Sequence, residues 1–306
     1  MDPMSLALTE PSHARTSVEV IRAKDELRAR LAAPRREGLA IGLVPTMGGL
    51  HEGHLSLLRA ARAGCDLVVM SLFVNPAQFG PGEDLERYPR DEQRDLALAA
   101  EAGADLVYAP SVEEVYPAGF ATAVEVSGLA EVLCGDPARR GPGHFRGVAT
   151  VVAKLFNTVQ PDVAYFGRKD AQQVAVIRQM ARDLDLSLRI EALPIVRELD
   201  GLALSSRNAY LSAVDRERAT ALFRALRAVE RTARERSLAA GLAAGLAELA
   251  AAGIEPEYLE ARDAEDLTPV ERLGDRPVLV AVAAQIGDAR LIDNIELRNE
   301  TTEART

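Results

Sequence analysis

The chain has 306 residues, enough for two ordinary domains, and a formal net charge of −10, which disfavours a broad nucleic-acid surface because phosphates are bound by clustered Lys and Arg. Cys65 and Cys134 are its only cysteines, which excludes a disulfide scaffold, and no apolar run reaches membrane-spanning length. We therefore expect a cytoplasmic globular protein with small-molecule partners, and neither nucleic-acid nor membrane binding.

The first two thirds of the chain alternate between helical and strand-like segments. Helices are predicted at 22–36, 54–63, 91–102, 146–159 and 170–183. Short apolar runs that predict strands lie at Leu39–Val44, Asp66–Val74, Asp105–Tyr108, Val163–Phe166 and Leu188–Leu193. Continuous apolar strands between helices are typical of a parallel sheet covered on both faces. We predict a Rossmann-like, doubly wound α/β domain at residues 17–195, preceded by a flexible tail at residues 1–16.

The pattern changes after about residue 196. Ser212 is a favourable N-cap for a helix predicted over 213–235, and the Ala-rich stretch 238–252 predicts a second helix. Three strand candidates follow, at Glu257–Ala261, Pro277–Ala284 and Ala289–Leu297. We therefore predict a second, smaller α+β domain over residues 196–299, which closes on the first as a lid.

Small and polar residues follow four of the predicted strands or lie beyond them, in the segments 45–54, 75–79, 167–173 and 205–208. Because the carboxyl ends of parallel strands share one edge of a sheet, we expect these segments to meet there. The first contains a Gly-Gly pair directly before a helix. Glycines allow close approach to a ligand, and the helix start offers free N–H groups and a positive dipole that suit a phosphate.

Three further features in these segments favour phosphate binding. His51 and His54 are three residues apart, so their imidazole N–H groups share one face and can steady a leaving pyrophosphate. A surface pair or a metal site is the alternative, although no third Cys or His ligand lies nearby. Lys169 is one of only three lysines, and residues 205–207 add two hydroxyls and a guanidinium.

Two glutamines suit a second, small polar ligand. Gln78 and Gln173 carry neutral donors and acceptors that match hydroxyl and carboxylate groups, although each taken singly is more often a surface residue. His144 either orders its loop or touches a ligand. The chain has no Walker A motif and no G-x-G-x-x-G after the first strand, which disfavours a dinucleotide redox cofactor.

Six motifs together resemble the pantothenate synthetase family, within the nucleotidyltransferase superfamily that carries an H-x-G-H signature. The resemblance runs from about residue 17 to about residue 298. Its motifs are Pro45-Thr46-Met47-Gly48 before His51 and His54, Phe73-Val74-Asn75-Pro76 with Gln78-Phe79, Tyr88-Pro89-Arg90, Gly143-His144-Phe145-Arg146-Gly147-Val148, Lys169-Asp170 with Gln172-Gln173, and Asp200-Gly201-Leu202-Ala203-Leu204-Ser205-Ser206-Arg207-Asn208.

The resemblance implies a two-step ligase of pantothenate biosynthesis. ATP and pantoate would form pantoyl adenylate and pyrophosphate, and the amine of β-alanine would then displace AMP to give pantothenate. Mg²⁺ would arrive with ATP rather than in a dedicated protein site, with no tightly bound cofactor. Family members are typically homodimers joined through the first domain, so a homodimer is expected here.

The resemblance also assigns roles to residues. His54, His51 and Lys169 would be catalytic. The ATP-binding set would be Pro45, Thr46, Met47, Gly48, His51, His54, Gly167, Lys169, Asp170, Val196, Leu204, Ser205, Ser206 and Arg207. The set that binds pantoate or β-alanine would be Gln78, Gln173 and Asn75. The segment Cys134–Pro142 is about three residues longer than the family pattern, so whether Arg139 or Arg140 matches the usual arginine stays open.

Two other functions are compatible with part of this pattern. A plain nucleotidyltransferase would share the loop of His51 and His54 but would not predict Gln78 and Gln173 together. A non-catalytic nucleotide-binding regulator would keep the fold yet tolerate the loss of Lys169 and His54. The products formed from ATP, pantoate and β-alanine distinguish all three.

Overall fold

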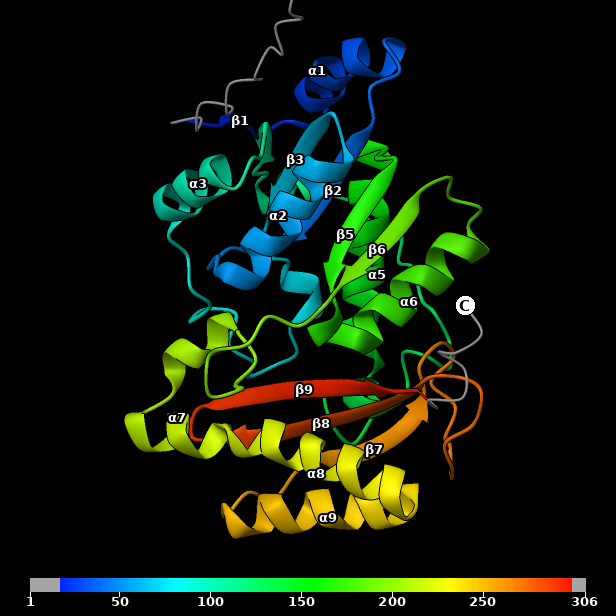
Figure 1. Ribbon diagram of the computed structural model, residues 1–306. Coiled ribbons are helices and arrows are strands. Elements are labelled where there is room, and N and C mark those ends of the chain that lie inside the picture. Colours follow the sequence, from blue (N-terminus) through cyan, green and yellow to red (C-terminus); the bar gives the residue numbers. More distant parts are fainter. Residues whose placement is uncertain (1–16, 299–306) are drawn as a thin grey trace, which may run out of the picture.

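The computed structural model describes residues 17–298, which form a parallel and an antiparallel sheet (Figure 1). The parallel sheet has the order β1-β4-β3-β2-β5-β6. Its strands are β1 (Glu19–Ile21), β2 (Ile41–Thr46), β3 (Leu67–Leu72), β4 (Leu106–Tyr108), β5 (Val163–Gly167) and β6 (Arg189–Leu193). The order of strands reverses between β2 and β5, and ligands bind at such a switch point in doubly wound sheets. The predicted fold class is confirmed.

Helices cover both faces of this sheet, as its continuous apolar strands require. One face packs against α1 (Lys24–Arg36), α5 (Pro142–Val159) and α6 (Ala171–Asp183), and the other against α2 (Glu52–Gly64) and α3 (Glu92–Glu101). A short helix, α4 (Val112–Val115), follows β4.

The predicted strands and most predicted helix ends lie within two residues of the observed ones. Helix α5 is an exception, because it begins at Pro142 rather than at 146. A proline is tolerated in the first helical turn, where its missing N–H has no partner to lose. Strand β1 was not predicted, and the expected tail at residues 1–16 lies outside the described residues.

The antiparallel sheet consists of β7 (Tyr258–Asp263), β8 (Val278–Ile286) and β9 (Ala289–Leu297). Its helices are α7 (Ala213–Ala219), α8 (Ala221–Glu235) and α9 (Leu238–Ala251). Ser212 is confirmed as an N-cap, since its Oγ accepts from Asp215 N at 3.1 Å. The prediction of one helix over 213–235 was wrong. Thr220 separates two helices there, its N–H and its hydroxyl both bonding to the Glu217 carbonyl.

Strand β8 is buried on both faces. Val280 and Val282 belong to the core beneath α8, whereas Leu279 and Ala281 belong to the core of the parallel sheet. The small sheet therefore lies between its own helices and the larger part of the molecule (Figure 1). Between residues 17 and 298, none of the helices has both the length and the apolar character that crossing a bilayer requires.

Candidate nucleotide and acid site

A cavity of about 220 Å³ lies at the carboxyl ends of β2, β3, β5 and β6. The loop after β6 and the 3₁₀ helix η4 (Ser206–Tyr210) close its other side. The predicted site residues that line it are Pro45, Thr46, Met47, His51, His54, Asn75, Gln78, Gly167, Lys169, Asp170, Gln173, Val196, Leu204, Ser205, Ser206 and Arg207. Segments up to about 160 positions apart in the chain thus share one cavity, as the sheet topology predicts.

The glycine turn before α2 is hydrogen-bonded to a side chain of α3 on the side away from the cavity. Gly48 and Gly49 have φ values of +88° and +62°, which side chains rarely adopt. Asp95 is only 1% exposed, and its carboxylate accepts from the N–H groups of Gly49 and Leu50, both at 2.8 Å. A Cβ on Gly48 would lie 3.0 Å from this carboxylate. Gly48 therefore faces α3 and is the one predicted site residue that does not line the cavity.

His51 and His54 cap the start of α2 with their own side chains. His51 Nδ1 accepts from Gly53 N at 3.1 Å, and His54 Nδ1 accepts from His51 N at 3.3 Å. An accepting Nδ1 places the proton of a neutral imidazole on Nε2, which leaves that N–H for a ligand. The two rings are 4.2 Å apart between centroids. The helix start thus aligns two neutral N–H donors at the cavity.

Burial keeps both imidazoles neutral. It lowers the pKa of His51 to about 4, and the positive charge of Lys169 acts in the same direction. Burial, with His51 and Lys169 adding to it, lowers the pKa of His54 to about 3. At neutral pH the site therefore holds a single ammonium beside two uncharged donors, which is suited to binding phosphate oxygens.

Another part of the cavity wall is built around the 3₁₀ helix η1 (Pro76–Gln78). Asn75 is 1% exposed and donates to Gln78 Oε1 and Gly147 O, both at 3.1 Å, while its Oδ1 accepts from Ala77 N and Tyr116 Oη. All four hydrogen-bonding positions of Asn75 are therefore used within the protein. Its direct contribution is to orient Gln78, whose side chain lines the cavity.

Several lining residues were given no role in a site from the sequence. An apolar wall comes from α5 and two strand ends, and it consists of Val148, Val151, Val152, Leu155, Phe73 and Phe166. In the sequence this stripe is indistinguishable from an ordinary core-facing helix. Ser71 also lines the cavity, and its buried Oγ has no hydrogen-bond partner among the described residues.

The choice between the two arginines depends on their partners. Arg139 turns away, pairing with Glu260 at 2.9 Å and stacking 4.7 Å over the Tyr258 ring. Arg140 lines the cavity instead and contacts Glu83 and His144. No pattern in the sequence distinguishes these neighbours, because distant partners decide their directions.

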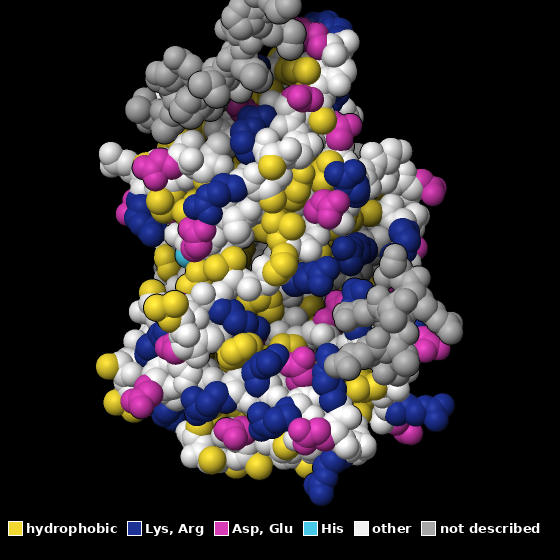
Figure 2. Space-filling view, viewed as in Figure 1, with side chains coloured by type: hydrophobic (Ala, Val, Ile, Leu, Met, Phe, Trp, Pro, Cys, Tyr) yellow, Lys and Arg dark blue, Asp and Glu magenta, His cyan; other side chains and the backbone are white. Residues whose placement is uncertain are grey.

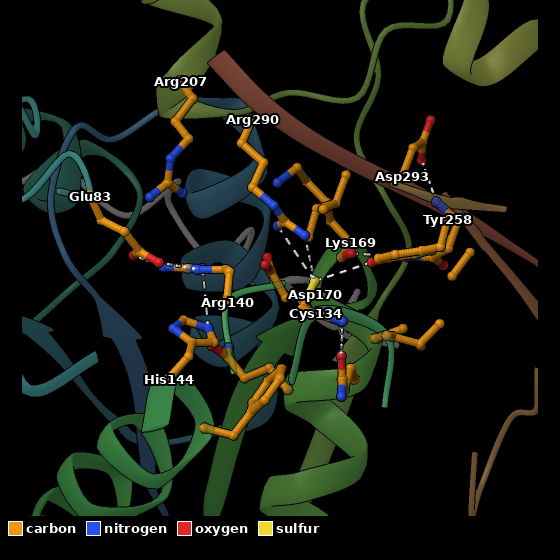
Figure 3. Close-up of a pocket in the computed structure, with 18 of the residues that line it drawn as sticks. Glu83, Cys134, Arg140, His144, Lys169, Asp170, Arg207, Tyr258, Arg290 and Asp293 are labelled. Atoms are coloured by element: carbon orange, nitrogen blue, oxygen red, sulfur yellow. Dashed lines mark hydrogen bonds and ion pairs between the residues drawn. The ribbon is translucent and has the colours of Figure 1, made fainter. Parts of the chain in front are cut away.

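A second cavity of about 350 Å³ adjoins the first, between the parallel sheet and the small antiparallel sheet (Figure 3). The two cavities share the lining residues Arg140, His144, Lys169, Asp170, Gln173 and Arg207. Within residues 17–298, no group of three or more His, Cys, Asp or Glu residues is arranged to hold a metal ion.

Comparison with known proteins assigns the family. The family model described as Pantoate-beta-alanine ligase matches residues 19–296. The chain belongs to the pantoate–β-alanine ligase family. It is 55% identical over 293 residues to the pantothenate synthetase of Moorella thermoacetica, covering 92% of this chain and 99% of that relative.

Solved structures of this ligase family share the fold. The pantothenate synthetase of Thermus thermophilus superposes with a TM-score of 0.86 at 49% identity, over 92% of this chain and 100% of that one. The Francisella tularensis pantoate–β-alanine ligase was solved in complex with Beta-gamma ATP and Beta-alanine. It superposes with a TM-score of 0.75 at 32% identity, over 91% of this chain and 97% of that one.

Proposed function

We propose that the cavity at the carboxyl edge of the parallel sheet holds ATP and pantoate side by side. The chain is an ATP-dependent ligase that condenses pantoate with β-alanine and yields pantothenate, AMP and pyrophosphate. The observation that carries the site assignment is that His51, His54 and Lys169 share one cavity with Gln78 and Gln173. Groups that can bind phosphate and amides that can bind a small acid thus line one cavity.

The first step is the attack of a pantoate carboxylate oxygen on the α-phosphorus of ATP. The bond between the α-phosphorus and the bridging oxygen breaks, and pyrophosphate leaves with that electron pair. His54 Nε2–H and the Lys169 ammonium neutralise charge on the leaving group, with His51 assisting. Because His51 and His54 are neutral and already oriented by the helix start, they need no protonation to act as donors.

We assign pantoate to the part of the cavity wall that η1 and α5 form, called the acid end below. The carboxylate and two hydroxyls of pantoate match the amides of Gln78 and Gln173, and its two methyl groups match the apolar wall of α5. In the second step the amine of β-alanine attacks the acyl carbon of the adenylate. The bond from that carbon to the phosphate oxygen breaks, AMP leaves, and the nitrogen loses its proton to solvent or to the phosphate.

We assign the rest of the cavity wall, called the nucleotide end below, to ATP. It includes residues from both parts of the chain. We assign Gly167, Asp170, Val196 and residues 204–207 to ATP, with Mg²⁺ entering on the triphosphate. We further propose residues 196–299 as a lid domain that shields the adenylate from water, a homodimer joined through the first domain, and a cytoplasmic location.

The reaction is tested by its products and by an isotope. With ATP, β-alanine and pantoate labelled with ¹⁸O in its carboxylate, AMP should carry one ¹⁸O, because that oxygen becomes bonded to phosphorus. ADP formation, or AMP without label in the presence of pantothenate, would contradict an acyl-adenylate route. A plain nucleotidyltransferase or a regulator would form no pantothenate.

Lys169 provides a test of the phosphate site. Lys169→Ala should reduce pantoate-dependent exchange of pyrophosphate into ATP by at least about 100-fold, since a charge used in the transition state is lost. Lys154→Ala is the matched control, because Lys154 packs over Phe120 away from the cavity lining. Unchanged exchange in Lys169→Ala would show that the phosphates bind elsewhere.

A further inference from the structure

Two consecutive carboxylates, Glu83 and Asp84, line the second cavity, and the proposed function gives them no role. Glu83 accepts from Arg140 Nε at 2.9 Å and also contacts Arg140 Nη2. Asp84 accepts from Arg207 Nε and Nη2, both at 2.8 Å. The four side chains are between 14% and 23% exposed, so these pairs are well shielded from solvent. One short loop thus holds two arginines that line both cavities.

Each carboxylate binds the same edge of its guanidinium. Nε and Nη2 are engaged, and Nη1 is left for another partner. In Arg140 that partner is His144, whose Nε2 lies 3.3 Å from Nη1. A guanidinium only donates, so His144 Nε2 accepts and the imidazole proton lies on Nδ1, 2.8 Å from the carbonyl oxygen of Gln78. Figure 3 shows Glu83, Arg140 and His144 in this order.

This series of contacts ends at the residue assigned to the acid substrate. The Gln78 side chain accepts from Asn75 and donates to Met47 Sδ at 3.0 Å, and its backbone carbonyl accepts from His144. Burial, with the charge of Arg140 adding to it, lowers the pKa of His144 to about 4, so its ring stays neutral and keeps this donor arrangement. Glu83 thus reaches Gln78 through two intermediates.

Asp84 leads to the nucleotide end instead. Arg207 follows Ser206, whose hydroxyl donates to Gly49 O at 3.2 Å in the turn before α2. In Figure 3 Arg207 comes from the opposite side of the cavity to His144. Among the described residues, no hydrogen bond joins the Asp84 carboxylate to the acid end, and none joins the Glu83 carboxylate to Arg207 or Ser206.

Both carboxylates stay ionised at neutral pH. Burial by itself would raise the pKa of Glu83, but the hydrogen bonds and positive charge of Arg140 outweigh it and lower the pKa below its ordinary value. Burial would also raise the pKa of Asp84, but Arg207 outweighs it and lowers this pKa, with a smaller contribution from the charge of Arg140. Removing either carboxylate would leave a shielded guanidinium without its orienting partner.

We propose that Glu83 and Asp84 are positioning residues with separate targets, Glu83 ordering the acid end through Arg140, His144 and Gln78, and Asp84 ordering the nucleotide end through Arg207. This assignment rests on the proposed function of the cavity, because it requires acid and nucleotide to occupy different ends. It assigns different positioning roles to two adjacent side chains, which the reaction itself does not specify.

Paired variants of the full-length protein test the division. Glu83→Ala should raise the KM for pantoate about tenfold and leave the KM for ATP within about twofold, since a displaced amide weakens acid binding. Asp84→Ala should instead raise the KM for ATP about tenfold and leave the KM for pantoate within about twofold. Glu83→Gln retains one acceptor for Arg140 and should lie between Glu83→Ala and the wild type. His144→Phe should reproduce Glu83→Ala, because it breaks the same series of contacts.

Equal effects on both KM values in Glu83→Ala and Asp84→Ala would overturn the proposal, since a merely structural loop would disturb both ends. Thermal unfolding of each variant checks that it folds, and calorimetric titration with ATP and with pantoate replaces KM where turnover is too slow. If the wild-type protein forms no pantothenate, the proposed function itself is refuted. That result is distinct from equal effects on the two KM values, which would refute only the roles of Glu83 and Asp84.

Discussion

The neutral histidines of α2 link stability to pH. In the unfolded chain a histidine has a pKa near 6.5, whereas burial lowers the folded value to about 3 for His54. The unfolded state therefore binds more protons below pH 6.5, so stability is fully present above that pH and is lost as pH falls toward the folded pKa. His51 and His144, with pKa values of about 4, act in the same direction.

His54→Asn should reduce this acid sensitivity. Near pH 5 the unfolded histidine is protonated and the folded one is not, which corresponds to about 1.4 kcal/mol of lost stability per pH unit for each such residue. The slope of unfolding free energy between pH 6 and pH 4.5, measured with urea, should be shallower in the variant by about that amount. An identical slope would mean that His54 titrates normally in the folded protein.

At the scale of single residues, the sequence predicted which residues line the cavity better than it predicted their contacts. The residue types and their places after strands were sufficient for His51, Lys169 and Gln78, which all line the cavity. They were not sufficient for Arg140, because its direction depends on Glu83, which lies 57 positions away. Asn75 was expected to touch a ligand, yet its polar atoms are all occupied within the protein.

At the scale of elements, the position of Gln78 depends on close packing of α5 against η1. A Cβ on Gly147 would lie 2.2 Å from Ala77 O and 2.7 Å from Gln78 Cα, so only glycine lets the helix approach this backbone. The glycine is therefore required by the position of Gln78 rather than by a turn.

Gly147→Ala should push η1 away from α5. We expect a loss of about 1–3 kcal/mol in unfolding free energy, as for other overpacked sites, and a raised KM for pantoate. Gly143→Ala in the same helix is the control, because nothing lies within 4 Å of a Cβ there. Its stability should change by no more than about 0.5 kcal/mol. Equal stability and equal KM values in the two variants would contradict this packing.

Elements were predictable where periodicity and capping act locally. The strands of the parallel sheet follow from short apolar runs between helices, and the N-cap of α7 follows from Ser212. The helix break at Thr220 was not predicted, because the residues around it keep an apolar helical period. The hydrogen bond from the Thr220 hydroxyl to the Glu217 carbonyl marks this break, and the hydrophobic periodicity of the sequence does not reveal it.

At the scale of the whole molecule, the small antiparallel sheet contributes side chains to two hydrophobic cores. Side chains of β8 alternate between the core under α8 and the core of the parallel sheet, which accounts for an apolar run with no polar face. Asn294 on β9 donates to the carbonyls of Arg168 and Lys169, both at 2.9 Å, so this sheet also supports the segment that carries Lys169. Such contacts between distant segments could not be predicted from local patterns.

Charge is also organised at this scale. The net charge is −10, yet Lys and Arg side chains gather over the middle and lower part of the face in Figure 2, around the junction of the two sheets. Overall charge disfavoured a broad nucleic-acid surface but did not indicate where cations gather locally. An anionic substrate meets the field near its site rather than the mean charge of the molecule.

A crystal structure of the protein with a non-hydrolysable ATP analogue and pantoate tests the central claim most directly. We predict phosphate oxygens within hydrogen-bonding distance of His54 Nε2 and Lys169 Nζ, and the pantoate carboxylate between Gln78 and the α-phosphorus. A triphosphate bound only in the larger cavity beside Arg290, with pantoate absent from the apolar wall of α5, would contradict the assignment.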